Sequence, residues 1–130
     1  MSKINTLQQE FNAAIIRRDK ICRVRDNAHC CCGALQCSHF HAVGGSSSLR
    51  FYPFNAFAQC ARHHELHHCG AREFYKEFLA ANYPKEFEFM NAVKTKPLKL
   101  CNEDIDLLTT LCRKNSLADI TVFHKERIWI

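Results

Sequence analysis

Histidines are concentrated in one short part of this chain. Seven of its eight histidines lie between His29 and His68, and the run that ends there reads C-A-R-H-H-E-L-H-H from Cys60. Imidazole is the commonest metal ligand in proteins, and its unperturbed pKa lies near neutrality. Such a density favours metal chemistry over packing as the reason for these residues.

Nine cysteines accompany the histidines. The chain opens M-S-K-I-N-T-L-Q-Q-E-F, which is not an apolar signal segment, and no apolar run reaches the roughly 18 residues of a membrane span. We therefore expect a cytoplasmic protein with no membrane segment. Thiols stay reduced in that compartment, so clustered Cys and His residues indicate metal ligands before disulfides.

A length of 130 residues predicts a single domain. Apolar residues spaced three and four apart predict a helix over residues 4–19. A strand at Gln36–Val43, a flexible connection at Gly44–Ser48 and an aromatic return strand at Leu49–Phe54 are expected next. The His-rich run then predicts a helix from Ala56 to about His68, so the fold class is α+β.

The rest of the chain reads as an extension of that first part. Helical spacing predicts helices over residues 71–81 and 85–94 and a third from Asn102, with the Phe-rich stretch between Phe74 and Phe89 as core. Alternating apolar residues predict a terminal strand over 120–130. We expect a functional core at about residues 15–80 that a bound zinc ion stabilises. A helical and terminal-strand extension is expected at about 81–130.

Two half-sites for a structural zinc ion can be read from the spacing. Cys60 and His63 form a C-x-x-H half-site, and His29-x-x-Cys32 forms a second one upstream. The expected ligands are Cys32, Cys60 and His63, with His29 or Cys30 as the fourth. Two other cysteines stay open as the completing ligand or as buried apolar residues: Cys22 and Cys31.

A second pair of histidines lies one helical turn apart, at His64 and His68. Two neutral imidazoles on one helix face can share a divalent ion. His63 and His67 form another such pair, rotated by about 100° around the helix. The two pairs therefore lie on two different faces of the expected helix, and each face can have a different function.

These residues resemble the HNH, or ββα-metal, nucleases, and most closely the NinG/Rap family of phage recombination endonucleases. Family members typically read C-x-x-C-G, a histidine on a first strand, a Gly-containing loop, an asparagine and C-x-x-C-H or a variant. The matching segments are I-I-R-R-D-K (15–20), H-C-C-C-G (29–33), S-H-F (38–40), L-R-F-Y-P-F-N (49–55) and Q-C-A-R-H-H (59–64). The resemblance covers roughly residues 11–80 and implies a bacterial host or a phage-infected cell as the setting.

The resemblance implies roles for individual residues. His39 matches the general base that activates water, and Asn55 matches the asparagine that braces the metal loop. His64 matches the last histidine of the motif, a ligand of a catalytic Mg²⁺ or another divalent ion. His68 extends the pattern to H-x-x-x-H, and His41 is a further candidate ligand. Many HNH enzymes place a metal ligand where this chain has Ser38, so the ion lacks a ligand there.

DNA is the implied partner, duplex or branched. The formal net charge is +5, and basic residues cluster before the cysteines. Such a surface suits polyphosphate. The residues expected to contact phosphates are Arg17, Arg18, Arg23, Arg50 and Arg62.

The expected function is therefore hydrolysis of DNA phosphodiester bonds by a metal-dependent endonuclease in phage or prophage recombination. The alternative is a zinc-stabilised nucleic-acid-binding module with weak or lost cleavage, which Ser38 favours. The oligomeric state is left open, a homodimer included.

Overall fold

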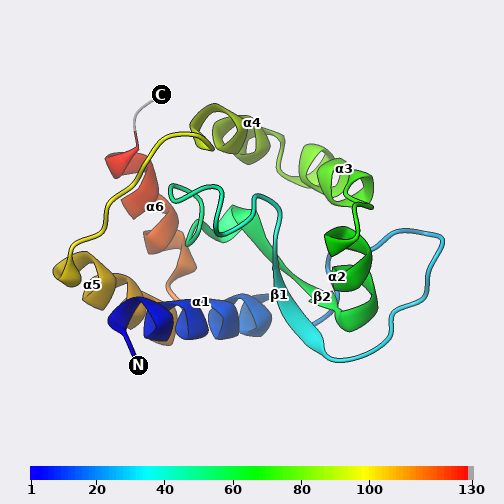
Figure 1. The fold of residues 1–130 in the computed structure, drawn as a ribbon, viewed down its shortest axis with the longest axis horizontal. Helices are drawn as coiled ribbons and strands as arrows, with labels where there is room; N and C mark the ends of the chain where they lie inside the picture. The colour runs from blue at the N-terminus through cyan, green and yellow to red at the C-terminus, as the bar shows by residue number, and fades with distance from the viewer. Residues whose placement is uncertain (129–130) are drawn as a thin grey trace.

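A computed structural model describes residues 1–128 of the chain (Figure 1). The described part contains six helices and one sheet of two strands, which confirms the α+β class. The strands are β1 (Leu35–His39) and β2 (Ala56–Cys60), and a short 3-10 helix, η1 (Pro53–Asn55), precedes β2. The helices are α1 (Lys3–Asp19), α2 (Ala61–His68), α3 (Glu73–Asn82), α4 (Pro84–Val93), α5 (Asn102–Arg113) and α6 (Leu117–Arg127).

Helix α1 agrees with the helix expected over residues 4–19. Its apolar stripe, which includes Leu7, Phe11 and Ile15, is fully buried. Ser2 caps the helix, because its hydroxyl accepts the N–H of Asn5. Lys20, at φ 66°, ends it in the left-handed region. The stripe packs against α5 and both strands. It thus forms the centre of one hydrophobic core, here called the first core.

The hairpin forms, but its second strand is not the expected one. Strand β1 pairs in antiparallel register with β2, from Leu35 opposite Cys60 to His39 opposite Ala56. The segment expected as the return strand, Leu49–Phe54, is instead a series of turns that leads into η1. All five residues of β2 are buried, so this strand lacks the polar alternation that marks a half-buried strand. The sequence pattern therefore predicts a helix from Ala56, whereas the helix begins at Ala61.

The terminal strand expected over 120–130 was also wrong. Residues up to Arg127 form α6, whose buried residues Leu117, Ile120 and Phe123 recur every three positions. These side chains close the first core against α1 and α5. Residues 129 and 130 of that expected strand lie outside the described residues.

A second core lies beneath the hairpin loop and the middle helices. It contains Tyr52 and Phe57 from the hairpin, Tyr75 and Leu79 from α3, and Met90 from α4, all fully buried or nearly so. The aromatic residues expected as core pack against it, half-buried: Phe74, Phe78, Phe87 and Phe89.

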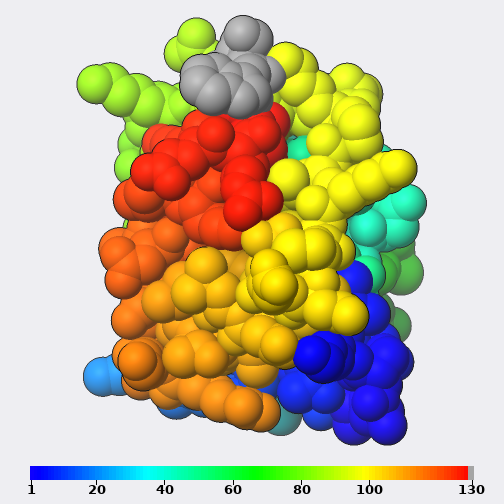
Figure 2. Space-filling view, turned by 90° about the vertical axis from the view of Figure 1, so that its left-hand side faces the viewer, coloured from blue at the N-terminus to red at the C-terminus, as the bar shows by residue number. Residues whose placement is uncertain are grey.

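The segment after α4 joins the two cores. Figure 2 shows residues of the 94–101 connection covering one side of the molecule above α5 and beside α6.

None of the helices described is both long and apolar enough to cross a membrane.

The loop between the strands is held firmly. The sequence predicted a flexible connection at Gly44–Ser48, yet each serine in it makes a hydrogen bond to the segment around the end of α4. The hydroxyl of Ser46 donates to the Lys94 carbonyl at 2.8 Å. The hydroxyl of Ser48 donates to the Val93 carbonyl at 2.8 Å, and Ser47 accepts the N–H of Leu98. Residues beyond position 81 therefore position this loop.

Candidate functional site

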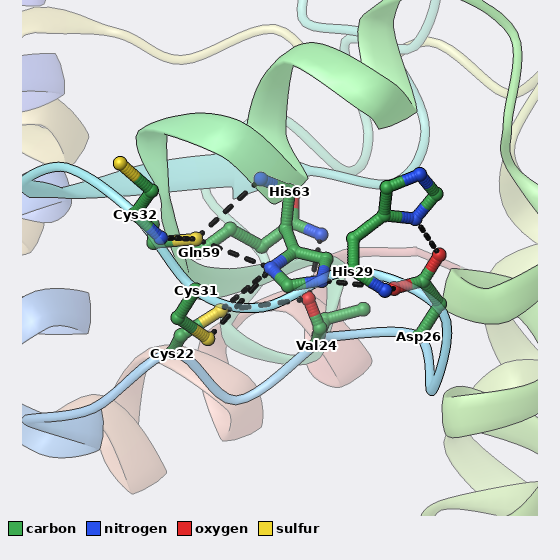
Figure 3. Close-up of polar contacts among 9 residues, drawn as sticks. Cys22, Val24, Asp26, His29, Cys31, Cys32, Gln59 and His63 are labelled. Atoms are coloured by element: carbon green, nitrogen blue, oxygen red, sulfur yellow. Dashed lines mark hydrogen bonds and ion pairs between the residues drawn. The ribbon is translucent and has the colours of Figure 1, made fainter.

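Four side chains converge beside the start of α2 (Figure 3). Cys22 lies after α1, Cys31 lies in the loop before β1, Cys60 ends β2, and His63 lies in the first turn of α2. One ligand atom from each lies within 4.8 Å of all the others. Three sulfurs and one imidazole are a common ligand set for structural zinc, so this cluster can bind a zinc ion.

The distances in the cluster fit a tetrahedral ion. Bond lengths of about 2.3 Å to sulfur and about 2.0 Å to nitrogen give S···N edges of about 3.5 Å in a tetrahedron. The Nδ1 atom of His63 lies 3.2 Å from the sulfur of Cys60, 3.7 Å from that of Cys31 and 3.9 Å from that of Cys22. The four atoms are therefore already arranged around one centre.

Backbone N–H groups prepare Cys60 as a thiolate. Its sulfur caps α2 by accepting the N–H of His63, and it also accepts the N–H of Cys32. Burial opposes ionisation of this thiol, but the two N–H groups, together with hydrogen bonds to the side chains of His63 and Cys22, lower its pKa to about 6. Cys60 is thus ionised at neutral pH, as a zinc ligand must be.

A glycine allows the loop before β1 to pass close to the start of α2. Gly33 has φ +89°, and a Cβ added there would lie 2.6 Å from the Cβ of Ala61. Only glycine therefore lets the loop of Cys31 and Cys32 pass so close to the start of α2.

Asp26 fixes the orientation of His63. Its carboxylate lies 3.0 Å from Nε2 of His63, which leaves Nδ1 free to face the sulfurs. The other oxygen of the same carboxylate lies 2.6 Å from Nδ1 of His29. A carboxylate behind a ligating histidine sets its tautomer and raises its basicity. The sequence reading missed Asp26, although it stands three residues before His29.

The cluster takes only part of the expected ligand set. Cys60 and His63 belong to it, but Cys22 and Cys31 stand where Cys32 and either His29 or Cys30 were expected. Figure 3 shows the side chain of Cys32 directed away from His63, while its backbone nitrogen faces the Cys60 sulfur. His29 is held by Asp26, and Cys30 is exposed.

The side of α2 that carries His64 and His68, about 100° around the helix from His63, borders a cavity of about 350 Å³. His39 from the end of β1 and His64 and His68 from α2 line it together. The rings of His64 and His68 lie 4.7 Å apart between centroids. The structure therefore brings the expected general base and the expected H-x-x-x-H pair to one cavity, and places His63 in the zinc cluster on another face.

Hydrogen bonds fix which ring nitrogens are free in this cavity. His39 donates from Nε2 to the Arg50 carbonyl at 2.9 Å, so its Nδ1 carries the lone pair. Burial lowers the pKa of His39 to about 4, so the ring is neutral at pH 7. His64 directs Nδ1 to the side-chain oxygen of Gln36, which leaves its Nε2 as the ligand atom. Burial and the neighbouring His68 lower the pKa of His64 as well.

Asn55 holds the loop that carries these residues. Its side chain is fully buried and accepts the N–H of His41 at 2.9 Å. Its amide donates to the carbonyls of His41 and Leu49. Asn55 thus ties both ends of the loop between the strands, and it does not line the cavity.

Two expected participants lie elsewhere. His41 lies two residues past the end of β1 and lines a separate, neighbouring cavity. Because β1 ends at His39, His41 does not share a strand face with His39, although both lie within the strand expected at Gln36–Val43. Ser38 is fully buried with no partner for its hydroxyl among the described residues. It points away from the cavity, because successive strand residues face opposite sides.

Several of the basic residues expected on DNA are used inside the protein. Arg17 donates to the Cys112 carbonyl and to Asn115, at the end of α5. Arg18 pairs with the buried Asp19 and donates to the carbonyls of Pro53 and Ala56. Arg17 and Arg18 are therefore engaged in contacts within the protein.

The other three expected arginines differ among themselves. Arg23 bonds Tyr83 and lies 3.5 Å from the Asp19 carboxylate. Arg50 bonds Gln8 and lies over the Phe51 ring. Arg62 is exposed on α2.

Two residues of the histidine cavity were missed as site residues. Arg72 precedes α3, lines the cavity and donates to the Phe40 carbonyl, with its guanidinium 4.9 Å above the Phe40 ring. His67 is buried and donates from Nε2 to the His39 carbonyl at 3.1 Å. Its place one turn after the buried His63 was the signal for an inward-facing residue. Arg72 had no such signal, because its place depends on the turn after α2.

No protein-family model, no curated protein and no solved structure matches this chain.

Proposed function

We propose that this protein is a metal-dependent endonuclease that hydrolyses phosphodiester bonds of DNA. The observation that supports the proposal most strongly is the cavity shared by His39, His64 and His68. It combines a neutral imidazole with a free Nδ1 and two further imidazoles that can share an ion. The sequence resemblance to HNH recombination nucleases adds the same roles, and we propose phage or prophage recombination as the setting.

His64 and His68 would hold the divalent ion, with the Nε2 of His64 as one ligand atom. When bound, such an ion supplies charge neutralisation on the phosphate oxygens and stabilises the leaving oxygen. Two imidazoles leave most of the coordination sphere to water and phosphate oxygens, and imidazole nitrogen suits Ni²⁺ or Zn²⁺ better than Mg²⁺.

The other residues act on water and substrate. His39 accepts the proton of the attacking water at Nδ1, while its Nε2–H stays on the Arg50 carbonyl. His67 holds the main-chain carbonyl of His39, and Asn55 holds the backbone of His41, so the chain at and after His39 is fixed. Arg72 adds a positive charge at the rim for the phosphate.

The experiment is a nicking assay on plasmid and branched DNA with protein that keeps its structural zinc and carries no catalytic metal ion. Mg²⁺, Mn²⁺, Ni²⁺ and Zn²⁺ are added back one at a time, and His39→Ala is assayed beside the parent. We expect metal-dependent nicking that His39→Ala abolishes while folding and DNA affinity stay nearly unchanged. A variant that nicks at the parental rate would show that His39 is not the base.

The second candidate is a zinc-stabilised DNA-binding module that does not cut. The burial of Ser38 favours it, because no side chain from that position reaches the ion. Metal-independent binding of the same DNA, with no nicking under any of the four metals, would establish this second function.

A further inference from the structure

A second, smaller cavity adjoins the histidine cavity. Its volume is about 240 Å³, and Arg72 and Ala42 line both cavities. Lys94 and His41 line the smaller one, beside the turn at Gly45. No Asp or Glu lines either cavity in the part of the chain that the structure describes. The two cavities therefore form one electropositive surface with Arg72 at the boundary.

The smaller cavity contains an unused polar group. The side chain of His41 lies there with Asn91 as a neighbouring hydrogen-bond partner, and its buried Nε2 atom has no partner of good geometry within residues 1–128. Burial, together with the charges of Lys94 and Arg72, lowers the pKa of His41 to about 4. An anion with oxygen acceptors would supply a partner for Nε2 and offset the two cations.

The walls of this cavity are held in place. Ser46 bonds the Lys94 carbonyl at 2.8 Å, and the N–H of Gly45 bonds the Ala42 carbonyl at 3.0 Å. The guanidinium of Arg72 is fixed on Phe40 by a hydrogen bond and by the ring beneath it. The backbone of the cavity and the Arg72 side chain are therefore already in place before a ligand binds, and only the exposed Lys94 side chain must be ordered.

We propose that Lys94, Arg72 and His41 form a binding subsite for the DNA phosphate next to the one that is cut. The inference rests on the proposed function, because the cut phosphate lies in the histidine cavity. One strand then passes from His64 and His68 across Arg72 to Lys94. The contacts are to phosphate oxygens and not to base edges, so they position the strand without reading its sequence.

The first test measures DNA binding by fluorescence anisotropy, with zinc-loaded protein and a labelled duplex in buffer without a catalytic metal ion. Lys94→Gln is compared with Lys99→Gln, an exposed lysine in the same segment that lines neither cavity. Lys94→Gln should reduce the log–log salt slope by about 0.9 and weaken binding several-fold for all sequences alike. Lys99→Gln should change both values far less. Equal effects of the two substitutions would overturn the subsite.

The second test locates the phosphate. Duplexes too short to be bound in more than one register, with one phosphate at a time replaced by a neutral methylphosphonate, are titrated with the parent and with Lys94→Gln. The parent should lose affinity at the linkage beside the cut, and Lys94→Gln should be insensitive there. A parent that tolerates neutral linkages on both sides of the cut would contradict the proposal.

The nicking assay with His39→Ala separates the two proposals. Nicking that depends on His39, with no distinct role for Lys94, removes only the subsite. A Lys94 effect on binding without any nicking removes the endonuclease and leaves a phosphate-binding site.

Discussion

The hydroxyl of Ser48 donates to the main-chain carbonyl of Val93 at 2.8 Å, and both residues are fully buried. This bond joins the loop between the two strands to the last residue of α4. Asn55 ties the same loop to itself, through Leu49 and His41. The loop that follows His39 therefore depends on a helix far along the chain, and the C-terminal half is part of the candidate site.

Ser48→Ala should loosen this connection. The lost hydrogen bond should reduce the free energy of unfolding by about 1 kcal/mol. Hydrogen exchange should speed up in the loop at residues 41–49, because its anchor to α4 is gone. Ser47→Ala is the control, since Ser47 is exposed and only accepts the N–H of Leu98. Equal exchange rates in the two variants would mean that the bond to Val93 does not hold the loop.

The zinc cluster predicts different outcomes for adjacent cysteines. Cys31→Ser should lose most of the bound zinc, because the Cys31 sulfur faces His63. Cys32→Ser should keep about one zinc per chain, since Cys32 contributes its backbone N–H and not its sulfur. Metal analysis of the two purified variants measures this directly. Zinc loss in Cys32→Ser alone would restore the ligand set expected from the spacing.

Local spacing determined what the sequence could predict. Helix α1 followed from apolar residues at 3–4 intervals, and the Cys60/His63 half-site followed from a separation of three residues. Cys22 and Cys31 could not be chosen, because their meeting depends on the path of the chain from α1 to Gly33. Strand β2 was misread, since burial on both faces removes the alternation. The anchoring of Ser46–Ser48 depends on residues more than 40 positions away, which composition does not show.

His64 and His68 should differ in how excess metal affects their variants. His64→Ala should lose nicking at every metal concentration, because its Nε2 is held ready by Gln36. His68→Ala should recover part of its activity in excess metal, since a secondary ligand mainly sets affinity. Both variants should keep the structural zinc, whose ligand on α2 is His63. Nicking rates across a metal titration, with zinc content as the control, test the assignment.

The pair of Asp104 and Arg127 predicts an acid-dependent loss of stability. Two hydrogen bonds from Arg127 lower the pKa of Asp104 to about 2, below its ordinary value of 3.8. A carboxyl whose pKa is lower in the folded state contributes stability above pH 4 and loses it between about pH 4 and 2. Asp104→Asn should therefore be less stable than the parent at pH 7, with the difference shrinking toward pH 2.

Denaturant midpoints measured from pH 7 to pH 2 test this pair. Asp106→Asn is the matched control, because Asp106 is 61% exposed and its ion pair with Lys3 is screened by water. The control should follow the parent at every pH. Parallel curves for Asp104→Asn and the parent would contradict the role of the pair.

Arg18 should contribute to the stability of the fold and not to DNA binding. Its guanidinium pairs with Asp19, whose side chain is fully buried, at 2.7 Å. Arg18→Ala leaves that carboxylate with only Arg23, at 3.5 Å, and the N–H of Ala58. It also removes the donors to the carbonyls of Pro53 and Ala56, which join η1 to β2. The free energy of unfolding should fall by about 2–3 kcal/mol, as expected when a buried ion pair loses one member.

Arg62→Ala is the comparison for Arg18→Ala, because Arg62 is exposed on α2 and was expected on DNA for the same reason. It should leave the denaturant midpoint within about 0.5 kcal/mol of the parent. In anisotropy titrations it should weaken DNA binding and reduce the salt slope by about 0.9 if it meets a phosphate. Arg18→Ala should keep the parental slope under conditions where it is folded. Suppose that folded Arg18→Ala shows a reduced salt slope of DNA binding and an unchanged denaturant midpoint. Arg18 would then belong to the DNA-binding surface.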